Sequence, residues 1–247
     1  MNINAKLLLN KFPKRRTQLS KPLKKIFDIE YKKNRTNFLT QLSESWLHFA
    51  IKGRLSNLNL STLEVGAGTL NHLKYESKNN LKNYNIIEPK KFLFKNNKLK
   101  SCVANVYKDF NKLPKNNFDR IISCAVLEHL EDLPMFLAKT GLAMKKNSYQ
   151  SHSIPCEGYP VWKITWDIIS GIPFKLRTGF NFSEIQNHEH INNHDEILCL
   201  IKYFYKKCDI TYSYPSFFTP YLSLYANLTF SKPNISIIKK FLKYEKK

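Results

Sequence analysis

Short apolar runs that end in turn residues alternate with longer amphipathic stretches through the middle of the chain. The runs have the length and the β-branched or aromatic content of buried strands, which predicts strands at 61–65, 84–87, 102–105, 118–124 and 149–154. The stretches between them repeat apolar residues at helical spacing, which predicts helices near 69–80, 90–96, 131–145 and 161–170. Strands and helices that alternate in this way form a parallel sheet with helices on both faces. The pattern therefore predicts an α/β fold with a doubly wound, mostly parallel sheet.

The two ends of the chain add elements to this core. Apolar residues at helical spacing predict N-terminal helices at 20–35 and 37–52. Near the other end, a helix predicted at 194–206 precedes two predicted strands at 209–214 and 222–230. The sheet is therefore expected to close with a C-terminal antiparallel hairpin.

An irregular segment interrupts the alternation after the fifth predicted strand. Residues 155–193 contain three prolines, three glycines and two tryptophans. Ligands of open α/β sheets bind beyond the carboxyl ends of the strands, and we expect this segment to cover that edge. The predicted division is an N-terminal basic helical segment, a ligand-binding core in two pieces, a cap insertion and a basic tail, at 1–57, 58–154 with 195–231, 155–194 and 232–247.

The composition is globular but strongly basic. Of the 247 residues, 43% are hydrophobic and 24% are charged, which is unlike a disordered chain. The net charge is +21, and residues 1–36 and 232–247 hold +9 and +5 of it. Basic ends of this kind attract nucleic acid or an anionic membrane surface. The alternative, which we favour because aromatic residues do not interleave with the lysines, is a lysine-rich composition on solvated faces.

Export and membrane insertion are not expected. No apolar run reaches the roughly 18–20 residues of a membrane helix, and the N-terminus has no signal-peptide core. The five cysteines are scattered and never form a Cys-x-x-Cys pair, so we expect reduced thiols. These features predict a cytoplasmic protein.

A glycine-rich turn follows the first predicted core strand. Gly66 and Gly68 stand in Leu63-Glu64-Val65-Gly66-Ala67-Gly68, where glycine lets the backbone turn tightly and approach a ligand. Glu88 ends the next strand twenty residues later, and a carboxylate at that distance can bind both hydroxyls of a ribose. A dinucleotide site would have a third glycine where Asn71 stands, and a P-loop would have a Gly-Lys-Ser/Thr string, which is absent. A tight turn without a ligand remains the alternative.

With the strings that follow, the chain resembles the class I S-adenosylmethionine-dependent methyltransferases over residues 63–130. The strings EVGAG, KDFNKLP and FDRIISCAVLEHL, with Glu88 between the first two, occupy the family's four motif positions. The strings GAGTLNHL, SIPCEG and HEHIN further resemble a bacterial subgroup often found among surface-polysaccharide genes. The resemblance implies a Rossmann-like fold and S-adenosylmethionine as cofactor. It also shows one departure, because Leu70 replaces the family's third motif glycine.

The resemblance implies nine cofactor-binding residues, all in or beside these motifs: Glu64, Gly66, Ala67, Gly68, Glu88, Asp109, Phe110, Cys124 and Ala125. The glycine loop would line the methionine and ribose, and the acid after the second strand would bind the ribose hydroxyls. The two residues after the third strand would contact adenine. The last two would place backbone near the methylsulfonium, and Glu64 would orient the loop or the ligand's amino group.

Three residues near the sheet edge are candidates for catalysis. A hydroxyl acceptor of high pKa benefits from a general base, and histidine suits that role near neutral pH. His129 follows the fourth strand, and the alternative is that it only begins a helix. His152 and Glu157 flank the end of the fifth strand, with a polar turn as the alternative.

We predict no metal site from the sequence. Some RNA-end and quinone methyltransferases hold a divalent metal with a Glu-x-x-Glu-His string, and Ala125 stands at the first acidic position here. His188, Glu189, His190 and His194 have a spacing that can bind metal. They lie in the predicted cap, where a surface position, or a hydrogen bond to a polar acceptor, is the alternative.

The expected function is methylation of an oxygen on a glycan or related small molecule. Trp162, Trp166 and Phe174 could stack on a sugar, with the apolar core of the cap as the alternative. A nucleic-acid methyltransferase is the second hypothesis, although no Asn/Asp-Pro-Pro-aromatic string follows the fourth strand. A non-catalytic cofactor-binding subunit is the third, and the presence of both loop glycines and both acids counts against it. Weak contact of the basic ends with an anionic membrane surface is compatible with all three.

Overall fold

The structure is a computed structural model that describes residues 3–34, 38–52, 60–213 and 218–244. At its centre lies one seven-stranded sheet in the order β3-β2-β1-β4-β5-β7-β6. Strands β1 to β5 run parallel, and β7 is antiparallel to both of its neighbours. The strands are β1 (Thr62–Val65), β2 (Tyr84–Ile87), β3 (Val103–Tyr107), β4 (Phe118–Cys124), β5 (Met144–Pro155), β6 (Tyr205–Tyr212) and β7 (Tyr225–Pro233). The predicted α/β fold, mostly parallel with a C-terminal antiparallel hairpin, is confirmed.

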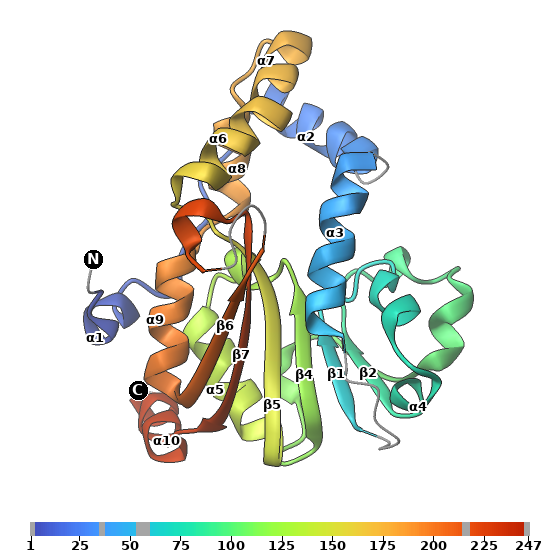
Figure 1. The fold of residues 1–247 in the computed structure, drawn as a ribbon, viewed down its shortest axis with the longest axis vertical. Helices are drawn as coiled ribbons and strands as arrows, with labels where there is room; N and C mark the ends of the chain where they lie inside the picture. The colour runs from blue at the N-terminus through green and yellow to red at the C-terminus, as the bar shows by residue number, and fades with distance from the viewer. Residues whose placement is uncertain (1–2, 35–37, 53–59, 214–217, 245–247) are drawn as a thin grey trace.

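Helices cover both faces of this sheet (Figure 1). On one face, α5 (Leu133–Ala143) packs against α9 (His194–Phe204) and α10 (Ile235–Tyr244). On the other face, α3 (Phe38–Ile51) contacts β4, β5 and β7. Successive side chains of a strand point to opposite faces of the sheet, so the apolar residues of each strand are shared between two cores. Ile121 accordingly joins the larger core, and Ile122 joins the smaller core beside α3.

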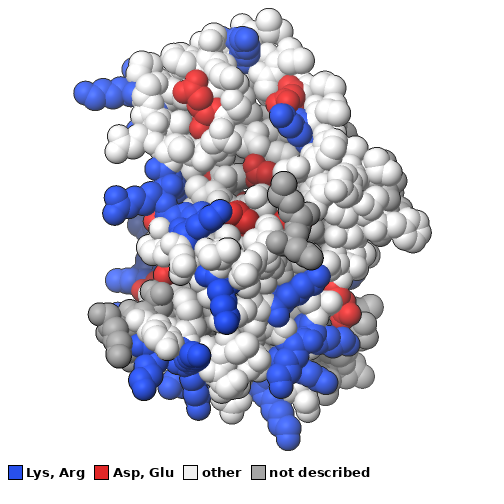
Figure 2. Space-filling model, turned by 90° about the vertical axis from the view of Figure 1, so that its left-hand side faces the viewer, with Lys and Arg blue, Asp and Glu red and all other residues white. Residues whose placement is uncertain are grey.

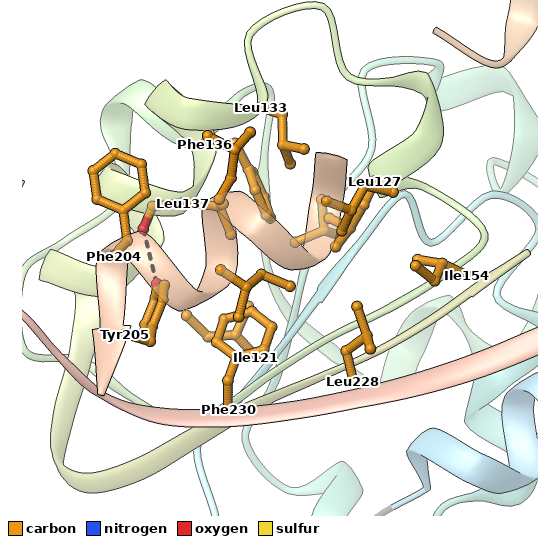
Figure 3. Close-up of a cluster of buried hydrophobic side chains, with 14 of the residues drawn as sticks. Ile121, Leu127, Leu133, Phe136, Leu137, Ile154, Phe204, Tyr205, Leu228 and Phe230 are labelled. Carbon is orange, nitrogen blue, oxygen red and sulfur yellow. Dashed lines mark hydrogen bonds between the residues drawn. The ribbon is translucent and has the colours of Figure 1, made fainter. Parts of the chain in front are cut away.

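The larger core is built from β4, β5, β7, α5 and α9 (Figure 3). Phe136 and Leu137 of α5 and Phe204 of α9 are fully buried there. Tyr205 begins β6 and donates its hydroxyl to Leu137 O (2.8 Å), so its one polar atom is satisfied within the core. This packing fixes α5, and with it the segment between β4 and α5, against the sheet.

The first predicted core helix is interrupted. In place of one helix near 69–80, the structure has the 3₁₀ turn η1 (Asn71–Tyr75) and the short helix α4 (Lys78–Leu81). Leu70 has a left-handed backbone (φ 63°), and Ser77 accepts a hydrogen bond from Asn80 N (3.3 Å) as an N-cap. The left-handed residue cannot continue a regular helix, and the Ser77 cap begins a new one, so a single helix over 69–80 does not form.

Other boundaries also differ from the expected ones. The helix predicted near 90–96 is only the 3₁₀ turn η2 (Lys91–Leu93), and η3 (Lys98–Cys102) follows it. Strand β5 begins five residues earlier than expected, and α10 forms within the predicted basic tail. The predicted helices 20–35 and 37–52 correspond to α2 (Lys21–Asn34) and α3. Predicted ends at 35, 37 and 214, and the boundary between 57 and 58, lie outside the described residues.

The cap is more helical than expected, and the helix predicted near 161–170 corresponds to its first two elements. It contains α6 (Pro160–Trp166), the π-helical turn η6 (Asp167–Gly171), α7 (Ile172–Thr178) and α8 (Phe182–Glu189). A small apolar core joins Phe174 and Ile185 of the cap to Leu23 of α2. The N-terminal helix α2 therefore packs against the cap, at the end of the molecule farthest from α10 (Figure 1).

Part of the N-terminal positive charge is used inside the protein. Lys14, between α1 (Ala5–Leu9) and α2, donates to Glu196 Oε2 (2.7 Å) and to Ile191 O (2.6 Å). Figure 2 shows Lys and Arg spread over one side of the molecule, mostly on its lower half, with uncharged surface between them. The basic N-terminal segment thus tethers itself to the cap and α9. Of the helices in the described ranges, none is both long and apolar enough to cross a lipid bilayer.

A charged network is buried between the sheet and α3. Arg120 of β4 donates to both carboxylate oxygens of Glu76, and neither side chain is exposed. His72 bonds to Glu76 through Nε2 (2.7 Å), and its Nδ1 lies 3.2 Å from Nδ1 of His48 on α3. This network connects η1 and α3 to the middle of the sheet.

Candidate functional site

The glycine-rich turn is held by the end of the neighbouring strand β2. Gly66 N donates to Ile87 O (2.8 Å), and Gly68 N donates to Glu88 Oε2 (2.8 Å). Lys90 N donates to the other oxygen of the same carboxylate (2.9 Å), and Glu88 is only 5% exposed. Each carboxylate oxygen has a further lone pair, so Glu88 can accept additional hydrogen bonds while it holds the loop.

The first loop glycine has no room for a side chain. Gly66 and Gly68 both have positive φ, at 69° and 51°. A Cβ atom built on Gly66 would lie 2.6 Å from Cγ2 of Val126, in the segment after β4. The turns that follow β1 and β4 are therefore packed directly on each other.

Leu70 keeps a glycine-like backbone despite its side chain. Its φ of 63° costs a residue other than glycine about 1–2 kcal/mol. The side chain is fully buried in the smaller core, and such burial stabilises by about 1.5–3 kcal/mol. Burial of the Leu70 side chain therefore offsets the cost of its backbone conformation.

The other residues implied in cofactor binding lie at the same sheet edge. Asp109 follows β3 and caps the turn η4 (Phe110–Lys112), and Phe110 begins that turn. Cys124 ends β4, and Ala125 (φ 52°) donates its N–H to Ser153 O (2.9 Å) of β5. Because these strands are parallel, their carboxyl ends meet where the glycine loop lies. Ala67, within the loop, is 5% exposed.

Glu64 points away from this edge into the smaller core. It is 2% exposed, and its Oε2 accepts a hydrogen bond from the hydroxyl of Tyr84 (3.0 Å). Burial raises the pKa of Glu64 to about 7, against the opposing charges of His72 and Arg120. Glu64 thus lies beneath the glycine-rich turn and is hydrogen-bonded to Tyr84 of the neighbouring strand β2.

Glu64→Gln is expected to stabilise the protein at alkaline pH. A carboxyl with a raised pKa in the folded state stabilises while it is neutral, and this contribution is lost as pH rises from about 4.5 to about 7. Glutamine stays neutral and can still accept from Tyr84, so the variant should be more stable than wild type by roughly 3 kcal/mol at pH 8. Urea unfolding at pH 5 and pH 8 measures this. A stability difference that is the same at both pH values would contradict the raised pKa.

The segment after β4 is clamped to the segment after α8. Ile191 N and Asn192 N both donate to Glu128 O (2.9 and 3.1 Å), in the 3₁₀ turn η5 (Leu127–His129). The Asn192 side chain donates to Leu127 O (3.0 Å) and Leu130 O (2.7 Å). These bonds join positions about 60 residues apart and fix the cap to the sheet edge.

The clamp brings two histidines and two glutamates together. His129 Nδ1 bonds to Glu189 O (2.8 Å), and His190 Nδ1 bonds to Glu157 Oε2 (2.6 Å). The two imidazole rings meet edge to face with centroids 4.8 Å apart. Glu128 is 1% exposed beside them. We call Glu128, His129, Glu157 and His190 the histidine cluster.

Burial and the electrostatic interactions among the residues shift the pKa values in the histidine cluster. Burial and the charge of His190 lower the pKa of His129 to about 3, so this imidazole is neutral at neutral pH. The positive charge of Lys90, which follows β2, also lowers the pKa of His129. Burial alone would lower the pKa of His190, but the hydrogen bond and charge of Glu157 raise it. Burial raises the pKa of Glu128 to about 7, against the effect of His190.

The remaining candidate residues lie elsewhere. His152 is fully buried within β5, where Nδ1 bonds to Ser123 Oγ (2.6 Å) and Nε2 to Gln150 Oε1 (3.0 Å). His188 bonds to Thr17 O and His194 to Asp195, so neither joins the histidine cluster. Of the three predicted catalytic residues, His129 and Glu157 thus come together through His190, and His152 stays in the core.

One important residue of the clamp was not predicted. Arg16 donates to His129 O (2.8 Å) and to Glu189 Oε1 (3.2 Å), and so holds both segments of the clamp. In the sequence it belongs to the basic run Lys14-Arg15-Arg16, which we interpreted as surface charge. No local pattern marks a residue whose partner lies 113 positions away.

Two solved structures described as S-adenosylmethionine-dependent methyltransferases share this architecture. One from Thermotoga maritima, described as an S-adenosylmethionine-dependent methyltransferase and possible histamine N-methyltransferase, has a TM-score of 0.58 at 14% identity and covers 84% of this chain and 98% of its own. Another, from Archaeoglobus fulgidus and described as S-adenosylmethionine-dependent, has a TM-score of 0.52 at 15% identity and covers 78% and 94%. No family model and no curated protein matches the sequence. The chain therefore shares the Rossmann-like fold of these two solved structures.

Proposed function

We propose that this protein transfers a methyl group from S-adenosylmethionine to an oxygen of a glycan or a related small-molecule acceptor. The observation that carries the proposal is the loop Gly66–Gly68, held by the Glu88 carboxylate and packed against Val126 at the carboxyl edge of the sheet. In this architecture, that edge is where ligands bind.

The residues present fit this cofactor. Glu88 retains lone pairs for two ribose hydroxyls, and the loop backbone is open to close approach because it lacks side chains at both glycines. Asp109 and Phe110 follow β3 at the position implied for adenine. When bound, the cofactor supplies a methyl group already activated by its sulfonium, so the protein contributes mainly alignment.

His129 is the proposed proton acceptor. Its Nδ1 faces a backbone carbonyl, which can only accept, so Nδ1 carries the hydrogen and Nε2 carries the lone pair. Nε2 accepts the proton of the acceptor hydroxyl as the oxygen takes the methyl group. Glu157 acts through His190, which it orients and keeps against the His129 ring. His152 has no part in this scheme, because both of its ring nitrogens bond to core residues.

A sugar-like acceptor is supported by the aromatic residues next to the histidine cluster. Trp162 and Trp166 stack with centroids 5.6 Å apart, and Trp162 lies 6.0 Å from the His190 ring. Trp162 itself is buried, whereas Trp166 is partly exposed and its buried indole N–H has no partner among the described residues. An unpaired donor beside an aromatic face suits a hydroxylated ring. The resemblance to a surface-polysaccharide subgroup supports the same acceptor class.

Gly66→Ala is expected to weaken binding of S-adenosylhomocysteine at least about tenfold, or 1.4 kcal/mol. The added Cβ meets Val126 at 2.6 Å, so the loop must move away from the ligand position. Titration calorimetry measures the affinity, with wild type expected to bind both cofactor and product. No heat from either compound with wild type would overturn the proposed function.

Gly179→Ala is the matched control for the backbone. Gly179 has a similar φ of 76°, but no described atom lies within 4 Å of its would-be Cβ. Both substitutions place an alanine in the left-handed backbone region, but only Gly66→Ala should lose affinity for S-adenosylhomocysteine. Adding Val126→Ala to Gly66→Ala should restore part of the binding, because it removes the clashing methyl group. Equal losses in both single variants would show that the clash is not the cause.

A further inference from the structure

Three potential ligand atoms of the histidine cluster lie close to one another. One carboxylate oxygen of Glu128 and one ring nitrogen each of His129 and His190 all lie within 4.8 Å of one another. We propose that these three side chains bind a divalent transition-metal cation. This inference deepens the proposed function, on which it rests for the position of the acceptor.

The two histidines are already arranged as metal ligands. A ligating histidine almost always donates its other ring N–H to a carbonyl or carboxylate, which fixes the tautomer and the ring orientation. His129 Nδ1 faces Glu189 O (2.8 Å), and His190 Nδ1 faces the Glu157 carboxylate (2.6 Å). In both rings, Nε2 is thus the nitrogen left for a ligand. Gln186 Nε2 donates to Oε1 of Glu157 (2.8 Å), so the carboxylate that orients His190 is itself held in place.

Glu128 supplies the independent observation. The residue is 1% exposed, and its Oε2 finds no hydrogen-bond donor within the described part of the chain. A buried carboxylate oxygen without a partner is costly, and a cation is one of the few partners that offset that cost. The backbone of Glu128 is fixed by Ile191 N and Asn192 N, so the clamp holds this side chain beside His190.

The ligand set selects the class of cation. Two imidazoles and one carboxylate suit transition metals such as zinc, cobalt, iron or manganese, with bonds of about 2.0–2.2 Å. The three atoms must close together by roughly 1 Å to reach this geometry. Three protein ligands leave coordination positions for oxygens of the acceptor. With a cation bound, Nε2 of His129 would be a ligand and not the proton acceptor. The cation would lower the pKa of a coordinated hydroxyl, which would release its proton to solvent water before it takes the methyl group.

Cobalt(II) binding to the whole chain tests the site without any need for an acceptor. Titration calorimetry and the visible absorption of bound Co²⁺ should both show one ion per chain. Glu128→Gln and His190→Gln preserve side-chain bulk and should weaken Co²⁺ binding at least about tenfold, and Glu157→Gln should weaken it about 10–100-fold. His188→Ala, in the same segment but outside the cluster, should bind Co²⁺ as wild type does.

Parallel titrations with S-adenosylhomocysteine separate the two proposals. Product binding without stoichiometric Co²⁺ binding would overturn the metal site and leave the methyltransferase proposal standing. Co²⁺ binding that His188→Ala abolishes and Glu128→Gln preserves would also overturn it, because the ion would then bind outside the histidine cluster. Co²⁺ binding lost in the cluster variants, in a protein that does not bind the product, would support the metal site alone. Thermal unfolding of each variant confirms that it is folded.

Discussion

Glu76→Leu is expected to lower the free energy of unfolding by about 3–5 kcal/mol. Arg120 is fully buried, and its guanidinium donates to both oxygens of Glu76. Removal of the carboxylate leaves a permanently charged guanidinium in the core without its counter-ion, and His72 loses its partner at 2.7 Å. Urea denaturation measures the change.

A double variant distinguishes the buried charge from the loss of packing. Glu76→Leu with Arg120→Met replaces the pair by apolar side chains, and such replacements are often close to neutral. The double variant should therefore be more stable than Glu76→Leu alone. If it is instead less stable, the isolated Arg120 charge is not what destabilises the single variant.

The same network predicts sensitivity to acid. Burial alone would raise the pKa of Glu76, but the hydrogen bond from His72 and the charge of Arg120 lower it to about 2. A carboxyl with a lowered pKa stabilises above its unfolded value, and this contribution is lost as pH falls from about 4.5 towards 2. Wild type should lose stability over this range more steeply than the double variant.

His129→Ala is expected to lower kcat about 10²–10⁴-fold, the range for loss of a general base. The His129 side chain is partly buried at the sheet edge and 30% exposed, and thermal unfolding of the variant checks that its truncation leaves the protein folded. The glycine loop and Glu88 do not depend on the imidazole, and the affinity for S-adenosylhomocysteine should stay the same. Release of S-adenosylhomocysteine is the readout, with the first sugar or glycan acceptor that turns over with wild type.

His188→Ala is the control for this experiment as well. His188 lies two residues from His190, but it bonds to Thr17 O and not to the cluster. Its kcat should remain within about threefold of wild type, because the His188 imidazole bonds to Thr17 O and to no residue of the histidine cluster. A kcat of His129→Ala equal to that of wild type would exclude His129 from the reaction. A parallel fall in product affinity would assign His129 to cofactor binding instead.

Features that depend on neighbours along the chain could be predicted from the sequence. The alternation of apolar runs and amphipathic stretches predicted the parallel sheet and the closing hairpin, because side-chain periodicity directly reflects which face of an element is buried. The loop at Gly66 and the acid at Glu88 were predicted at the same sheet edge, because the carboxyl ends of adjacent parallel strands meet there. The prediction of a helix over 69–80 was wrong because Leu70 adopts a left-handed backbone conformation, which leucine disfavours and local propensity therefore does not indicate.

The histidine cluster was decided by tertiary structure alone. The sequence predicted no metal site, since the string around His129 lacks an acid at Ala125. It placed His190 in a cap over the sheet edge without indicating which residues His190 contacts. Folding brings His190 to Glu128 through backbone bonds across about 60 residues, and Arg16 fastens the same segments from 113 positions away. Periodicity and motif spacing describe contacts within an element or between adjacent elements. The partners of a cap residue depend on how separate elements pack, and that packing is set by the sum of burial over the whole chain.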